Sequence, residues 1–308
     1  MTLANFLGAM PGTISQGLIW GIMAIGLYIT YKVLNLSDLT VDGSICTGGA
    51  VCVMLVVAGV PVPVAMLGAI VAGMLCGLVT GLLHTFMGIP AILAGILTQL
   101  SLYSVNLKIM GKPNVALSVR NYDLLISLNY VRNPLLTNTI FIICIILILL
   151  IAVLYWYFGT EMGCGVRATG DNQNMARAQG INTEFYKVFG LILSNGIVAL
   201  AGAMLVQYQG FCDVSMGRGA IVIGLASIVI GKAMFGRLLP KNFACKLLAC
   251  ALGGVVYYIV YQTVILLGLD ADLLKMLSAI VVAIFLAVPY WKKKYFTKAH
   301  AKGGVDHA

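Results

Sequence analysis

Long apolar runs separated by short polar breaks set the pattern of this chain. The runs are close to 20 residues and lack the period-two alternation of barrel strands, so each predicts a membrane-spanning helix. A helix satisfies its own backbone N–H and C=O groups, which lipid cannot do. The runs predict nine spans, at residues 13–34, 42–58, 62–83, 89–110, 136–158, 185–207, 217–235, 244–267 and 273–290. We therefore expect an all-α helical bundle that forms one transmembrane domain over residues 1–308.

Composition supports this class and narrows the functions. Hydrophobic residues make up 61% of the chain and charged residues 9%, and the mean hydropathy is +1.01, far from soluble globular usage. The net charge of +9 is spread among loops and a short tail, so it predicts contact with lipid headgroups and no nucleic-acid partner. The eight cysteines show no paired spacing for a metal site and are interpreted as packing residues.

Basic residues predict the orientation, because Lys and Arg are retained on the cytoplasmic side of short loops. An external N-terminus places most of the 19 basic residues inside. The loop at 159–184 and the basic tail at 291–308 are then cytoplasmic, as is the C-terminus.

The loop at 159–184 is the most polar interruption of the chain. Within it, residues 170–180 predict one short helix that is capped by Asp171 or Asn172 and ended by Gly180. A polar, capped helix between two spans indicates a docking element. The charged residues of this loop are Glu161, Arg167, Asp171, Arg177 and Glu184.

A second polar segment, residues 36–49, lies at the start of the second predicted span. Such polarity is costly in lipid, so it predicts a broken or re-entrant helix start that lines a water-filled path. For Asp42 the path and a simple helix cap remain equal alternatives, whereas Asp38 is expected to cap the helix at the interface. Residues 213–219 repeat the pattern of an acid, a hydroxyl and glycines, which predicts an inverted repeat unless the match is chance.

Small residues predict how the helices pack. Gly73, Gly77 and Gly81 form a continuous stripe, and we favour packing within the chain over homodimerisation. None of the eight prolines is expected in the middle of a span.

Polar groups inside or at the mouths of spans are the candidates for the translocation pathway. Thr47 and Ser194 are more simply explained by hydrogen bonds to their own helix carbonyls four residues back. Carboxamides cannot satisfy all their groups in that way. The candidates are Asp42, Ser44, Thr47, Thr98, Gln99, Ser194 and Asn195.

Three segments carry a resemblance to a known family. Residues 165–182 resemble the cytoplasmic loop of the permease subunits of ATP-binding-cassette importers in the branched-chain amino acid and ribose family. Residues 38–49 resemble the polar start of that family's second span, and residues 223–231 resemble its apolar, glycine-ended segment after the loop. The short N-terminus and the loop look nearest to permeases for amino acids, of the tryptophan or tyrosine type.

The resemblance implies an importer subunit of the bacterial plasma membrane that carries a small solute inward. Its partners would be two cytoplasmic ATPase subunits, a second permease copy or close relative, and an extracytoplasmic solute-binding protein. The loop helix would couple to the ATPase. By the match, the coupling residues are Gly170, Asp171, Asn172, Ala176, Arg177 and Gly180.

Other functions are less well supported. A sugar or nucleoside permease of the same family is the runner-up. An ion-coupled carrier would need ionisable residues inside the spans, which hold almost none beyond Asp42. The chain offers no convergent catalytic or metal-binding set and no phosphate-binding Gly-Lys-Ser/Thr loop. We therefore expect no enzyme activity and no cofactor on this chain, with ATP and Mg bound by the partner ATPases.

Overall fold

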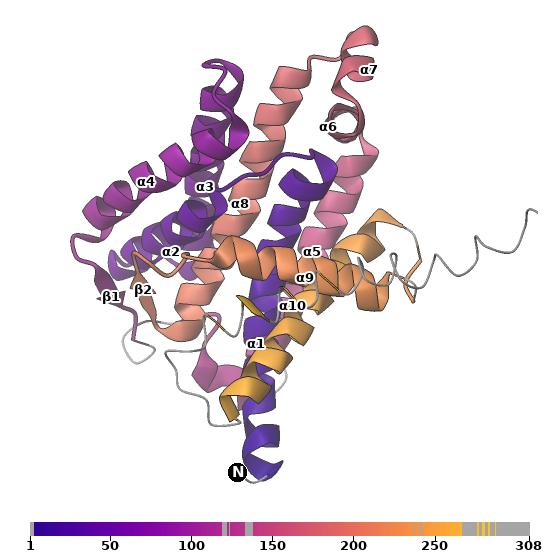
Figure 1. Ribbon diagram of the computed structural model, residues 1–308. Helices are drawn as coiled ribbons and strands as arrows, with labels where there is room; N and C mark the ends of the chain where they lie inside the picture. The colour runs from indigo at the N-terminus through magenta and orange to yellow at the C-terminus, as the bar shows by residue number, and fades with distance from the viewer. Residues whose placement is uncertain are drawn as a thin grey trace, which may run out of the picture.

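The architecture is a helical bundle with one small β-ribbon (Figure 1). The computed structural model describes residues 3–118, 122, 124–132, 138–236, 238–240, 242–266 and a few isolated positions up to 287. The helices are α1 (Leu3–Tyr28), continued by the π-helix η1 (Ile29–Val33), α2 (Val41–Val57), α3 (Val62–Thr85), α4 (Ala91–Met110), the short 3₁₀ helix η2 (Leu128–Arg132), α5 (Thr139–Gly159), α6 (Glu161–Asp171), α7 (Gln173–Ala178), α8 (Thr183–Gln209), α9 (Ala220–Phe235) and α10 (Phe243–Leu266). The strands are β1 (Asn114–Ala116) and β2 (Phe211–Asp213).

Helices occupy the first eight of the predicted runs. Within the described residues, six helices are long and apolar enough to cross a membrane, while α2 and α9 are shorter, at 17 and 16 residues. The ninth run, 273–290, and the tail, 291–308, lie outside the described residues apart from isolated positions of that run. The helix α1 begins at Leu3, so Pro11 lies inside it. Pro11 lies near the start of the apolar span Gly8–Val33, so it does not contradict the expectation that no proline falls in the middle of a span. Membrane helices tolerate proline where neighbouring groups satisfy the freed backbone.

The centre of the bundle is formed by α1 and α8, whose apolar windows are each 78% buried. The helix α1 packs against α8 and α10, and α8 packs against α3. The glycine stripe of α3 faces α8: a Cβ atom at Gly77 would overlap the Leu191 carbonyl oxygen, and one at Gly81 would lie 3.0 Å from the Val188 side chain. Packing of the stripe within the chain is thus confirmed, because small residues let two backbones approach closely.

The bundle has two distinct ends (Figure 1). The helices α6 and α7 lie at one end, together with the start of α8. The N-terminus lies at the other end, as does the antiparallel ribbon in which Val115 pairs with Cys212.

Candidate functional site

The polar loop folds as two helices instead of one. The helix α6 starts at a Thr160 cap and ends at Asp171. Asn172 then adopts an extended backbone, with φ −152°, and its side chain accepts a hydrogen bond from Met175 N at 3.1 Å. Of the two predicted caps, Asp171 and Asn172, it is Asn172 that forms. The single helix over 170–180 was wrong because Gly170 and Asp171 belong to α6. After the C-cap of α7, Gly180 has φ +78°.

The helix α6 is seated on the end of α1. A Cβ atom at Gly170 would overlap the Val33 carbonyl oxygen and lie 2.7 Å from Leu34 Cα. Val166 and Thr169 on α6 are also buried. Gly170 therefore faces the bundle, and its lack of a side chain permits contact between the two backbones.

The helix α7 has one buried and one exposed face. Ala176 is 4% exposed, whereas Met175 is 64% exposed and Asp171, Asn172, Arg177 and Gly180 are all exposed. The sequence-based coupling set includes the buried Ala176 and does not include the exposed Met175. Met175 is the one large apolar side chain of α7.

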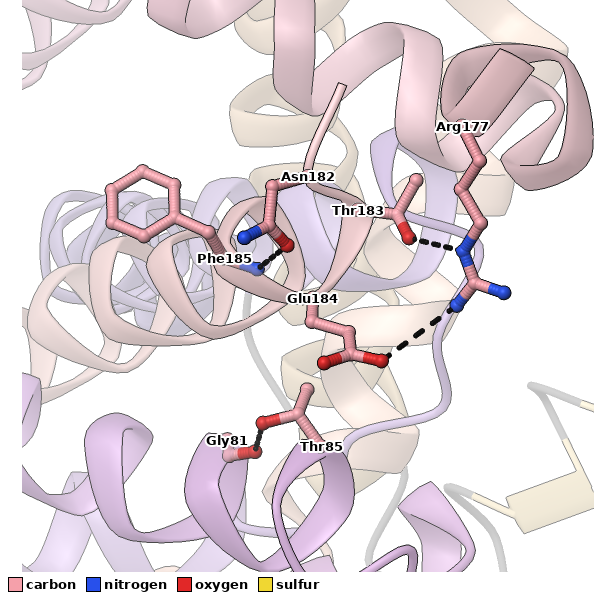
Figure 2. Close-up of polar contacts among 7 residues, drawn as sticks. All are labelled: Gly81, Thr85, Arg177, Asn182, Thr183, Glu184 and Phe185. Carbon is pink, nitrogen blue, oxygen red and sulfur yellow. Dashed lines mark hydrogen bonds and ion pairs between the residues drawn. The ribbon is translucent and has the colours of Figure 1, made fainter. Parts of the chain in front are cut away.

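The connection from α7 to α8 is short and braced (Figure 2). Asn182 accepts a hydrogen bond from Phe185 N at 3.2 Å and so caps α8. Arg177 Nε donates to Thr183 Oγ1 at 2.8 Å, and Arg177 Nη2 lies 3.9 Å from Glu184 Oε1. The ion pair is largely exposed and contributes little energy. The hydrogen bond and the cap fix the direction in which α8 leaves α7.

Asp38 belongs to a buried polar cluster at the start of α2. It is 1% exposed, and its Oδ1 accepts from Thr40 N at 2.9 Å. Its Oδ2 accepts from Asn195 Nδ2 at 2.8 Å, and Asn195 Oδ1 accepts from Ser44 Oγ at 2.6 Å. The predicted interfacial cap at Asp38 was therefore wrong: the linker before α2 folds back into the bundle, and Thr40 occupies the cap position.

Threonines extend this cluster across α3 and α4. Thr40 Oγ1 lies 2.7 Å from Thr80 Oγ1, which lies 3.0 Å from Thr98 Oγ1. Thr47 donates to the carbonyl of Gly43 at 3.0 Å, so the bond to its own helix is confirmed. Gln99 is half-buried on α4.

Asp42 and Ser194 have partners on distant helices. Asp42 Oδ2 accepts from Gly219 N at 3.1 Å and Oδ1 from Ile221 N at 2.9 Å. It therefore caps α9, which neither sequence interpretation had proposed. Ser194 Oγ donates to the Gly26 carbonyl at 2.7 Å, so the expected bond to its own helix was wrong, and it ties α8 to α1.

The predicted pathway residues do not line the large cavity at the N-terminal end. That cavity has a volume of about 690 Å³ and is lined by α1, η2 and the ends of α8 and α10, including Gln16, Tyr208, Gln209 and Gln262. Tyr208 donates its hydroxyl to the Gly12 carbonyl at 2.8 Å. Five of the predicted residues, Ser44, Thr47, Thr98, Ser194 and Asn195, are instead buried.

Comparison with known proteins gives consistent matches along most of the chain. Residues 10–288 match the family described as branched-chain amino acid transport system / permease component. The tyrosine transport system permease protein of Clostridioides difficile strain R20291 is 38% identical over 282 residues, which cover 90% of this chain and 91% of the relative. The uncharacterized protein RP368 of Rickettsia prowazekii is 35% identical, covering 89% and 95%. The autoinducer 2 import system permease protein LsrC of Yersinia pseudotuberculosis is 30% identical, covering 68% and 58%.

Proposed function

The chain belongs to the family of branched-chain amino acid transport system permease components, and from this premise we propose that it imports an amino acid, with an aromatic one as the first candidate. The observation that carries the solute class is the 38% identity to a tyrosine transport permease along nearly the whole chain. A sugar or nucleoside solute is the second candidate, because a relative named for autoinducer 2 import also matches.

The proposed assembly follows from the family. Two cytoplasmic ATPase subunits bind ATP and Mg and drive transport, a second permease completes the membrane part, and an extracytoplasmic binding protein delivers the solute. The subunit lies in the bacterial plasma membrane with its C-terminus and the loop 159–184 in the cytoplasm. The ninth span and the basic tail remain proposals on the sequence pattern alone.

We assign the ATPase contact to α7 and its flanking residues. The support is the geometry: α7 lies at one end of the bundle, is capped at its start, and exposes Met175 beside Arg177. Gly170 and Ala176 serve the same loop by seating it on the bundle. A short capped helix held in this way moves as a rigid body with the subunit it touches.

We propose a physical route from the loop into the bundle. The Gly170 backbone contacts the backbone of Val33 and Leu34. Four residues after Leu34, Asp38 accepts a hydrogen bond from Asn195 of α8. Displacing α6 would therefore shift the linker before α2 and the buried cluster together. Buried polar pairs resist separation because an unpaired partner in the bundle has no water to bind.

We also propose that α1–α3 and α8–α10 form an inverted repeat. In Figure 1 α1 and α8 run in opposite directions, and each leads into a short helix, α2 or α9. Asp38 accepts from Thr40 N and Asp213 accepts from Ser215 N at 2.6 Å, so the same turn precedes both short helices. The packing is reciprocal, since α3 lies against α8 and α10 lies against α1. The pathway assignment of Asp42, Gln99 and the buried residues stays a prediction.

The coupling proposal is tested by comparing Met175→Glu with Met87→Glu. Both methionines are exposed, at 64% and 66%, and Met87 lies in the α3–α4 connection at the same end of the bundle. A charge placed in a docking pocket weakens binding by about ten-fold or more. We expect Met175→Glu to lose ATPase recruitment in a pull-down, together with solute-stimulated ATP hydrolysis, while Met87→Glu keeps both.

Two outcomes would count against the proposal. Equal recruitment by wild type and Met175→Glu would remove α7 from the ATPase contact. Equal loss in both variants would show that the effect comes from surface charge at this end and not from α7.

A further inference from the structure

A narrow cavity between α1, α9 and α10 has a basic rim and an apolar floor. Its volume is about 260 Å³, and its rim carries Lys32, Lys232 and Lys246. Its lining also includes Ile228, Ala249 and Cys250, which are largely buried, and the half-buried Phe235 and Leu239. We propose that this cavity binds one anionic phospholipid of the surrounding membrane.

The rim favours binding of an anion because the positive charges of its lysines have no acidic partner among the described lining residues. The three lysines come from η1, α9 and α10, and all three are exposed. Among the described residues that line the cavity, none is acidic. A cavity lined by charges of one sign attracts ions of the opposite sign. A phosphate group supplies that anion and several hydrogen-bond acceptors.

The floor distinguishes a lipid from a free anion. Inorganic phosphate needs no apolar surface, whereas the floor is built from apolar residues of α9, α10 and the connection between them. Lysine side chains at helix ends extend their charged groups to the headgroup level while their stems cover apolar surface. Lys232 is in the last turn of α9 and Lys246 is in the first turn of α10, as this arrangement requires.

The position also separates the lipid site from the proposed ATPase contact. A neighbouring cavity of about 690 Å³ shares Lys32 and Lys246 and reaches α6 at Arg167 and Asp171. The lipid cavity itself has no residue from α6 or α7 in its lining. The headgroup would thus lie beside the seat of α6 without occupying the exposed face of α7.

The experiment uses the purified full chain in neutral detergent and native mass spectrometry. Phosphatidylglycerol or phosphatidylcholine is titrated into wild type, into Lys232→Gln/Lys246→Gln, and into the control Lys108→Gln/Lys112→Gln. The control lysines are exposed and lie at the opposite end, beside β1. We expect wild type to retain phosphatidylglycerol in preference to phosphatidylcholine. The rim variant should bind it about 25-fold more weakly, since each lysine near an anionic surface contributes roughly five-fold, and the control should match wild type.

Two further arms identify the source of the phosphate. Leu239→Gln keeps the rim charges but adds a polar group to the floor, and we expect it to weaken phosphatidylglycerol binding as well. Inorganic phosphate in excess should not displace the lipid from wild type. This part of the experiment uses the wild-type protein alone. An unfolding temperature equal to wild type in phosphatidylcholine establishes that each variant is folded.

Three results would overturn the proposal. Equal weakening in the control pair would show unspecific charge attraction. Displacement by inorganic phosphate, with Leu239→Gln unchanged, would show a simple anion site. In the assembled transporter, cross-linking of Lys246 to an ATPase subunit in place of lipid would show that a protein partner covers the cavity.

Discussion

The bond between Asp38 and Asn195 gives the sharpest test of the buried cluster. Asp38 joins the linker before α2 to α8 through Asn195 Nδ2 at 2.8 Å, and it also accepts from Thr40 N at 2.9 Å. Replacing Asp38 by alanine removes both acceptors and leaves Thr40 N without its partner inside the bundle.

The expected loss follows from the number of bonds. A hydrogen bond to a charged group contributes about 1.5–3 kcal/mol, and removing a buried carboxylate recovers part of its desolvation cost. For Asp38→Ala we therefore expect a net loss of about 2–4 kcal/mol in the free energy of unfolding. That corresponds to a fall of roughly 3–6 °C in the unfolding midpoint for a chain of this size.

The exchange variant Asp38→Asn/Asn195→Asp separates the bond from general disruption. Asp38→Asn alone places two amide groups face to face. The exchange restores one donor and one acceptor between the two side chains with the direction reversed, and Ser44 still donates to residue 195. The Leu191 carbonyl loses the donor that Asn195 Nδ2 supplies at 3.0 Å in wild type, so the recovery is partial. We expect the exchange to recover about 1–3 kcal/mol relative to the sum of the single variants, which is the usual coupling of contacting residues.

The assay measures the unfolding midpoint in detergent, ATPase recruitment, and ATP hydrolysed per solute transported. We expect the single variants to recruit the ATPase but to hydrolyse more ATP per solute, and the exchange to return toward wild type. If the exchange is no more stable than the sum of its parts, the two side chains do not act as a pair. If the ratio of ATP to solute is unchanged in all variants, the cluster is structural and does not transmit movement.

Three further variants test other contacts. Gly180→Pro should abolish solute-stimulated ATP hydrolysis, because proline cannot adopt the φ of +78°. Gly180→Ala should lower the free energy of unfolding by only about 1 kcal/mol. Equal ATP hydrolysis by the two variants would contradict the role of this turn. Gly77→Ala should destabilise the fold by about 1–3 kcal/mol through backbone overlap, and Gly68→Ala, which meets only the end of a leucine side chain at 2.7 Å, should cost less in the same thermal assay. Asp42→Ala should speed hydrogen exchange at the Ile221 amide by about ten-fold or more, since the cap contributes about 1–2 kcal/mol, whereas unchanged exchange would show that the cap is not formed in solution.

The sequence by itself determined the class, the family resemblance and the positions of eight helices. In lipid each span must satisfy its backbone hydrogen bonds internally, so it forms a helix of apolar residues. Such a helix can be recognised in the sequence as a continuous apolar run. Packing through the glycine stripe on α3 could also be predicted, because the spacing of small residues along one helix face is visible in the local sequence. The cap of α7 was predicted to within one residue, as Asp171 or Asn172, because the partner of Asn172 is only three residues away.

Only the tertiary structure decided which polar groups meet. Asp38 finds Asn195 at a separation of 157 residues, and Asp42 caps a helix that begins 178 residues later. The local sequence does not distinguish an acid that caps its own helix from one that caps a distant helix. In both cases the acid stands at the start of an apolar run. The seat of Gly170 on Val33 and Leu34 likewise exists only once the bundle has formed.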